Sequence, residues 1–230
     1  HQTYFSLIHM PICLFRLKLN HLIPTYQVSE EKSTNFAQNL KKMQKIAVFG
    51  SGSGSNAENI IRYFSESTGV EIGPLVSNTS KSRFRLIAET NHIDYLEFDN
   101  AAFEKNIEPI IEKLKEYQVD WIVLAGFLRK IHPQLLQAFP NRIINIHPSL
   151  LPNYGGPGMY GMRVHQSVFE NKEVESGITV HFVNENFDEG KIIEQKKVNI
   201  ANCTDPDQIR AKVQELEQLY FPQIINDLIQ

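Results

Sequence analysis

The sequence is poor in cysteine, contains no long apolar run and has no excess of positive charge. Its two cysteines, Cys13 and Cys203, stand far apart outside any spacing motif. This excludes a disulfide scaffold and a cysteine-rich zinc site, and it favours the reducing cytoplasm. No apolar run approaches the roughly 18 residues that cross a bilayer, so we expect no membrane contact. The formal net charge of −3 argues against nucleic acid as the main partner.

Enough apolar residues are present for one hydrophobic core. Hydrophobic residues make up 42% of the 230 residues and charged residues 21%, which is typical of one globular domain. Residues 1–42 carry a net positive charge and lack helical or strand periodicity, and Met43 stands just before the first clear strand. We therefore expect 1–42 to be an irregular N-terminal extension outside the fold, Met43 to be the natural start, and 43–230 to form the domain.

From residue 45 onward, strand-like and helix-like stretches alternate. Short apolar runs predict strands, and apolar residues that repeat with a helical period predict helices. The expected strands are 45–50, 70–77, 94–98, 121–125, 142–146, 177–183 and 191–198. The expected helices are 56–65, 82–90, 103–117, 132–139, 164–171 and 205–229, with Pro109 a kink or late start and Pro222 a bend. This order predicts an α/β fold: an open, mostly parallel twisted sheet with helices on both faces.

A loop rich in glycine and serine follows the first expected strand. Residues 50–56 read Gly-Ser-Gly-Ser-Gly-Ser-Asn and lead into a helix. Glycines let the backbone approach a ligand, and a helix N-terminus offers free N–H groups that suit a phosphate. A plain tight turn capped by Ser55 or Asn56 is the alternative. Position 55 lacks the glycine of a dinucleotide fingerprint, and the Gly-Lys-Ser/Thr ending of a P-loop is absent. A phosphomonoester is therefore the predicted ligand.

Asn145 and His147 stand at the carboxyl end of an expected buried strand. Alternation along a strand places both on one face. The amide can donate a hydrogen bond to an oxygen that gains negative charge, and the imidazole can carry a proton near neutral pH. The alternative is a histidine bonded to a loop carbonyl and an asparagine that caps a turn.

The acidic connection 184–190 precedes the last expected strand. Within it, Asp188 can face His147, favour the charged imidazole and fix its tautomer; a solvated turn is the alternative. His147, His165 and His181 lack the spacing of metal ligands, so we predict no metal site.

Five stretches together resemble the phosphoribosylglycinamide formyltransferases, a family of folate-dependent enzymes of purine synthesis. They are Gly-Ser-Gly-Ser-Asn at 52–56, Leu-Ala-Gly-Phe-Leu-Arg at 124–129, Asn-Ile-His-Pro-Ser-Leu-Leu-Pro at 145–152, His-Phe-Val at 181–183 and Asp-Glu-Gly at 188–190. The run at 145–152 is highly specific for folate formyltransferases. The resemblance covers the chain from residue 43 onward and implies a Rossmann-like formyltransferase domain over 43–230.

The resemblance also implies a reaction and a set of site residues. A formyl group would pass from 10-formyltetrahydrofolate to the amine of 5′-phosphoribosylglycinamide in de novo purine (IMP) biosynthesis, without a metal. The catalytic positions match Asn145, His147 and Asp188. The positions that bind the phosphoribosyl substrate match Gly54, Ser55, Asn56 and Glu217. The positions that bind folate match Leu128, Arg129, Lys130, Ile131, Asn145, Asn184, Glu185, Asn186, Phe187 and Asp188.

In the implied mechanism, Asn145 and a protonated His147 stabilise the oxygen of a tetrahedral intermediate, and Asp188 supports the imidazolium. The chain departs from the family in its long loop 154–163, whose four glycines suggest a mobile lid. Residues 99–103 also lack an arginine that often meets the folate tail. Another folate formyltransferase, a formyltetrahydrofolate hydrolase with the same core, and a non-catalytic phosphate-binding α/β module remain alternatives.

Overall fold

A computed structural model of the chain describes residues 43–66 and 69–230. The predicted extension over 1–42 lies outside the described residues and stays a prediction. The strands are β1 (Gln44–Phe49), β2 (Val70–Ser77), β3 (Tyr95–Glu97), β4 (Trp121–Leu124), β5 (Ile143–His147), β6 (Glu175–Phe182) and β7 (Ile192–Asn199). The helices are α2 (Ser55–Phe64), α3 (Phe84–Thr90), α4 (Asn100–Lys105), α5 (Glu108–Glu116), α6 (Pro133–Ala138), α7 (Met162–Glu170) and α8 (Pro206–Ile229).

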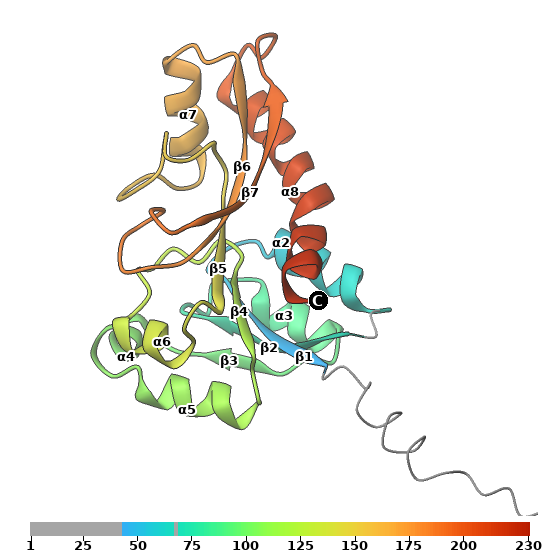
Figure 1. Cartoon of the computed structure of the whole chain (residues 1–230), viewed down its shortest axis with the longest axis vertical. Coiled ribbons are helices and arrows are strands. Elements are labelled where there is room, and N and C mark those ends of the chain that lie inside the picture. The colour runs from blue at the N-terminus through green and yellow to red at the C-terminus, as the bar shows by residue number, and fades with distance from the viewer. Residues whose placement is uncertain (1–42, 67–68) are drawn as a thin grey trace, which may run out of the picture. The chain divides into compact units, whose positions relative to one another are not determined.

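The seven strands form one sheet in the order β3-β2-β1-β4-β5-β6-β7 (Figure 1). The pairs from β3 to β5 are parallel, whereas β6 runs antiparallel to β5 and β7 antiparallel to β6. The predicted open, mostly parallel sheet is confirmed.

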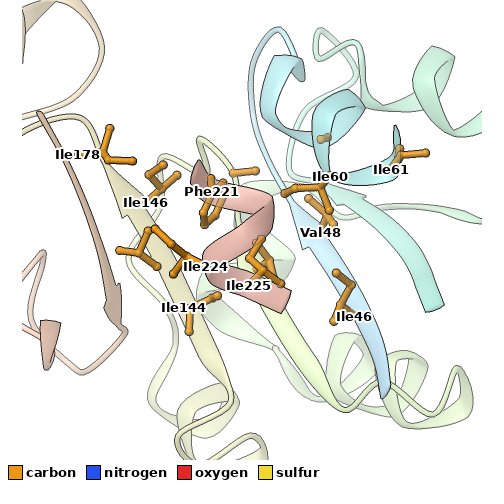
Figure 2. Close-up of a cluster of buried hydrophobic side chains, with 14 of the residues drawn as sticks. Ile46, Val48, Ile60, Ile61, Ile144, Ile146, Ile178, Phe221, Ile224 and Ile225 are labelled. Carbon is orange, nitrogen blue, oxygen red and sulfur yellow. The ribbon is translucent and has the colours of Figure 1, made fainter. Parts of the chain in front are cut away.

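Helices cover both faces of the sheet because side chains alternate along each strand. Ile46 and Val48 of β1 pack in a core with α2, α3 and α8. Figure 2 shows this core, where Phe221 and Ile224 of α8 lie against the sheet. Ala47 and Phe49 of β1 belong to the core on the other face, with side chains from α4, α5 and α6. The two cores confirm the expected layers.

One expected helix is two in the structure. The pattern over 103–117 predicts a single helix, but α4 ends at Lys105 and α5 begins at Glu108. The Asp99 side chain accepts a hydrogen bond from Ala102 N at the start of α4, and Pro109 lies in the first turn of α5. Proline fits a first turn because it lacks the N–H that an interior position needs, so the late start is the correct alternative.

The register of the sheet gathers the loops that matter for function. Phe49 of β1 pairs with Leu124 of β4, Leu124 pairs with Asn145 of β5, and Asn145 pairs with His181 of β6. The carboxyl ends of β1, β4 and β5 therefore meet at one edge of the sheet, where open α/β sheets bind ligands. In the described part of the chain, no helix combines the length and apolar character needed to cross a membrane.

Candidate active site

A cavity of about 470 Å³ opens at this edge of the sheet. Its wall is built from the loops after β1, β4 and β5, from the β6–β7 connection and from one face of α8. The lining side chains and backbone come from 52–56, 124–131, 145–148, 183–184 and 186–188, with further contributions from α7 and α8. The cavity thus joins the segments that sequence reasoning singles out separately.

His147, the last residue of β5, is buried at 4% exposure. Ile144 and Ile146 point into the core under α8, so Asn145 and His147 share the opposite side of the strand. His147 Nε2 lies 2.7 Å from the Tyr154 carbonyl oxygen. A carbonyl only accepts, so Nε2 carries a proton and donates it, which leaves Nδ1 as the nitrogen that can gain a proton.

Asp188 lies against that second nitrogen. Its Oδ2 is 3.5 Å from His147 Nδ1 and its Oδ1 is 3.7 Å from His181 Nε2. The Gly156 N–H donates to Oδ2 at 2.9 Å. Burial would raise the pKa of Asp188, but the neighbouring His181 and His147 side chains and the Gly156 N–H favour the carboxylate more strongly and hold this pKa below its usual value. The group is therefore a carboxylate at neutral pH.

The pKa of His147 is lowered in the free protein. Burial disfavours the imidazolium more strongly than Asp188 and the Tyr154 carbonyl favour it, and His181 adds to the lowering. At neutral pH the ring is therefore neutral, with a vacant Nδ1 that faces a carboxylate. The imidazolium of the implied mechanism therefore arises when a proton enters the site.

Asn145 is oriented by a histidine of the neighbouring strand. His181 Nδ1 lies 2.8 Å from the Phe182 carbonyl oxygen and donates to it. His181 Nε2 lies 3.1 Å from Asn145 Nδ2 and accepts one of its two amide protons. The other N–H of Asn145 stays available for an oxygen in the cavity.

Asn56 and Glu217, which are 161 residues apart, meet at the glycine loop. Asn56 Nδ2 donates to Glu217 Oε2 at 2.9 Å. Burial raises the pKa of Glu217, and the Asn56 hydrogen bond opposes that rise. Gly54 precedes α2 in the left-handed conformation (φ 79°), and no side chain caps the helix. The first N–H groups of α2 are thus open to an anion, as the loop predicts.

Most of the predicted folate-binding residues line the cavity. They are Leu128, Arg129, Lys130, Ile131, Asn145, Asn184, Asn186, Phe187 and Asp188. Glu185 is exposed and is not among the residues that line the cavity, so its role in folate binding stays a prediction.

Comparison with known proteins decides the family. The model of the formyl transferase family matches residues 44–225, most of the chain. The chain belongs to the formyl transferase family. It is similar to the chloroplastic phosphoribosylglycinamide formyltransferase of Arabidopsis thaliana, with 38% identity over 189 residues, which cover 80% of this chain and 65% of that relative. The enzyme of the same name from Bacillus subtilis is 37% identical over 191 residues, which cover 81% of this chain and 95% of the relative.

Solved structures of the formyl transferase family share the fold. The crystal structure of phosphoribosylglycinamide formyltransferase from Bacillus halodurans matches with a TM-score of 0.74 and 30% identity, over 81% of this chain and 96% of that one. Glycinamide ribonucleotide transformylase 1 from Symbiobacterium toebii matches with a TM-score of 0.72 and 32% identity, over 80% and 86% of the two chains.

Sequence reasoning assigned no role to several residues of this formyl transferase fold that line the cavity: His165, His181, Arg210 and Gln214. The sequence does indicate that His181 is buried, because alternation along β6 places it on the same face of the strand as other buried residues. Its pairing with Asn145 depends on the antiparallel register of β5 and β6, which the sequence does not specify. Among residues 43–66 and 69–230, no group of three or more His, Cys, Asp or Glu side chains could hold a metal ion.

Proposed function

We propose that the protein transfers the formyl group of 10-formyltetrahydrofolate to the amine of 5′-phosphoribosylglycinamide, a step of de novo purine biosynthesis. The observation that carries the proposal is the convergence of Asn145, His147 and Asp188 on one wall of the cavity. The same cavity is lined by the N-terminus of α2 and by the segment 128–131. The relatives' names support this substrate pair.

The glycine loop end of the cavity suits the phosphoribosyl part of the amine substrate. The open N–H groups of Ser55 and Asn56 can donate to phosphate oxygens at the positive end of the α2 dipole. Glu217 is half-buried beside them and can bond to a ribose hydroxyl in either protonation state.

The apolar part of the cavity suits a flat heterocycle. Its apolar lining includes Phe127, Leu128, Ile131, Val183 and Phe187, and backbone N–H and C=O groups of the loop after β4 lie among these side chains. Such a mixture of apolar surface and a few directed polar groups is typical of cofactor-sized sites. When bound there, the folate would supply an activated formyl carbon beside Asn145 and His147.

The state of the histidine suggests the order of proton transfers. Neutral His147 accepts a proton at Nδ1 from the substrate ammonium, which leaves a neutral amine able to attack the formyl carbon. The new Nδ1–H lies next to the Asp188 carboxylate, which stabilises the imidazolium. As the amine nitrogen bonds to the carbon, the carbonyl electrons move to oxygen. The remaining N–H of Asn145 donates to that oxygen, and the positive charge of the nearby imidazolium stabilises it electrostatically. The attacking nitrogen, which carries one proton too many after the bond forms, releases that proton to water. His147 returns its own proton, through water, to the folate nitrogen as the bond between that nitrogen and the formyl carbon breaks.

The experiment mixes the purified protein with 10-formyltetrahydrofolate, with and without phosphoribosylglycinamide, and follows the release of tetrahydrofolate. Release that requires the amine, with formylated amine as product, supports the proposal. Release without the amine would instead indicate the hydrolase, and no release at all would indicate a binding module.

The family match over 44–225 supports 43–230 as the formyltransferase domain. We propose the cytoplasm as the compartment of the protein.

A further inference from the structure

One face of α8 runs from the glycine loop to a part of the cavity whose residues have no role in the mechanism proposed above. Arg210, Gln214 and Glu217 are spaced i, i+4, i+7 along α8 and therefore share one face of the helix. All three line the cavity. Because each residue of a helix rises about 1.5 Å, Arg210 lies about 10 Å along α8 from Glu217. Glu217 in turn contacts Asn56 of the glycine loop.

His165 of α7 lies beside Arg210. It is buried at 4% exposure, and it lines the same cavity. Its Nδ1 is buried without a hydrogen-bond partner in the described part of the chain. Burial, the charge of Arg210 and the charge of His147, in that order, lower the pKa of His165 to about 4, and Asp207 partly opposes them. The ring is thus neutral, and Nε2 carries its proton because Nδ1 has no acceptor.

A phosphate bound at the glycine loop would need a nearby cation to balance its charge. A phosphate monoester brings up to two negative charges at neutral pH, whereas the loop supplies neutral N–H groups and the partial charge of one helix dipole. The cations Arg129 and Lys130 line the cavity after β4, and Arg129 pairs with Glu104 at 3.4 Å. Arg210 is the cation that lines the cavity from the helix that carries Glu217.

Arg210 has donors to spare. Its Nη2 atom contacts Asp207 Oδ1 at 2.9 Å, and both side chains are exposed. An exposed pair of this kind contributes little and exchanges readily. The guanidinium keeps further N–H donors in a fixed plane, the geometry that matches phosphate oxygens.

We propose that Arg210 and His165 form a second wall of the phosphate site, opposite the N–H groups of Ser55 and Asn56. The Arg210 guanidinium and the Nε2–H of His165 donate to oxygens of the phosphate, so that the site selects a phosphorylated amine over its dephosphorylated form. This inference rests on the proposed function for the identity of the substrate, but the binding chemistry is testable without turnover.

The test measures the affinity of the full chain for ribose 5-phosphate and for ribose by calorimetry. Arg210→Gln is expected to weaken ribose 5-phosphate binding about tenfold or more, the usual effect of losing a charged hydrogen bond, and to leave ribose unchanged. His165→Leu is expected to weaken it several-fold, and His165→Gln, which keeps a donor, to restore part of the loss. Lys212→Gln is the matched control, because it removes one charge from the same helix at a residue that bonds the Asn199 carbonyl instead.

Steady-state kinetics separate this role from a structural one. Arg210→Gln should raise KM for phosphoribosylglycinamide, with little change in kcat or in KM for 10-formyltetrahydrofolate. Equal ribose 5-phosphate affinity in wild type and Arg210→Gln would overturn the inference. An equal loss of ribose 5-phosphate affinity in Lys212→Gln would also overturn it. So would a rise in KM for 10-formyltetrahydrofolate alone in Arg210→Gln, because Arg210 and His165 would then bind the folate carboxylates. Phosphate binding that depends on Arg210 without any formyl transfer would uphold this wall and reject the proposed function. The Arg210 side chain is exposed, so we expect Arg210→Gln to fold. The test can therefore be completed with this variant even if His165→Leu, a change at a buried residue, does not fold.

Discussion

His147 Nδ1 lies 3.5 Å from Asp188 Oδ2, while the other ring nitrogen of His147 donates to the Tyr154 carbonyl. The ring is therefore held at both ends, and its orientation does not depend on a bound ligand. A carboxylate that faces a vacant ring nitrogen attracts a proton to that position. The site is arranged to take one proton from its substrate and to stabilise it next to the reacting carbonyl.

Replacing Asp188 by asparagine keeps the shape of the side chain and removes the charge. The imidazolium at His147 then loses its stabilising partner, so we expect kcat to fall about 100-fold or more. Folate affinity, measured by fluorescence titration, should change little because the backbone of the loop is retained. A variant with near wild-type kcat would show that the carboxylate does not support His147.

The lowered pKa of His147 sets the acid limb of the pH profile. His147 must be unprotonated to accept the substrate's proton, so kcat/KM should fall as the pH drops through its pKa, below the usual imidazole value of about 6.5. Asp188 raises the pKa of His147. In Asp188→Asn this pKa falls further, so the acid limb of the residual activity should shift to still lower pH. An acid limb above pH 7 in the wild type would contradict the assignment.

His165 makes stability depend on pH. Its pKa is about 4 in the folded chain and about 6.5 when unfolded, so the unfolded chain binds more protons in this interval. The contribution of His165 is complete above pH 6.5 and is lost as the pH falls towards 4. It amounts to about 3 kcal/mol.

The measurement compares urea unfolding of wild type and His165→Gln at pH 7 and pH 4.5. The variant should lose less stability between the two values than the wild type. His92→Asn, a change at an exposed histidine, should follow the wild type. Parallel losses in all three proteins would exclude burial of a neutral His165.

Gly190 fixes the loop that carries Asp188. A Cβ at this position would overlap the Phe182 carbonyl oxygen and approach the ring of His181. Gly190→Ala should therefore cost about 1–3 kcal/mol of stability and lower kcat, because the loop must move and take Asp188 with it. Gly52→Ala, where a Cβ meets nothing within 4 Å, is the control for stability and should unfold like the wild type.

Much of this arrangement follows from local sequence patterns. The strand 70–77 is predicted to the residue, and the alternation along β5 places Asn145 and His147 together because one residue in two faces each side. Glycine spacing predicts the open helix N-terminus at Gly54. These features depend on neighbours along the chain, which a sequence displays directly.

Other features depend on contacts between distant segments. The partner of Asn145 is His181, 36 residues away, and it is set by strand register. The resting charge of His147 follows from burial by several loops at once, so the sequence indicates its partner but not its protonation.

The most direct test of the central claim is formyl transfer by His147→Ala under single-turnover conditions, with folate affinity measured on the same sample. The account predicts a loss of at least about 100-fold in the transfer rate with nearly unchanged folate binding, since the backbone of β5 and the apolar lining remain. A transfer rate close to that of the wild type would contradict it, because His147 would then take no part in moving the proton.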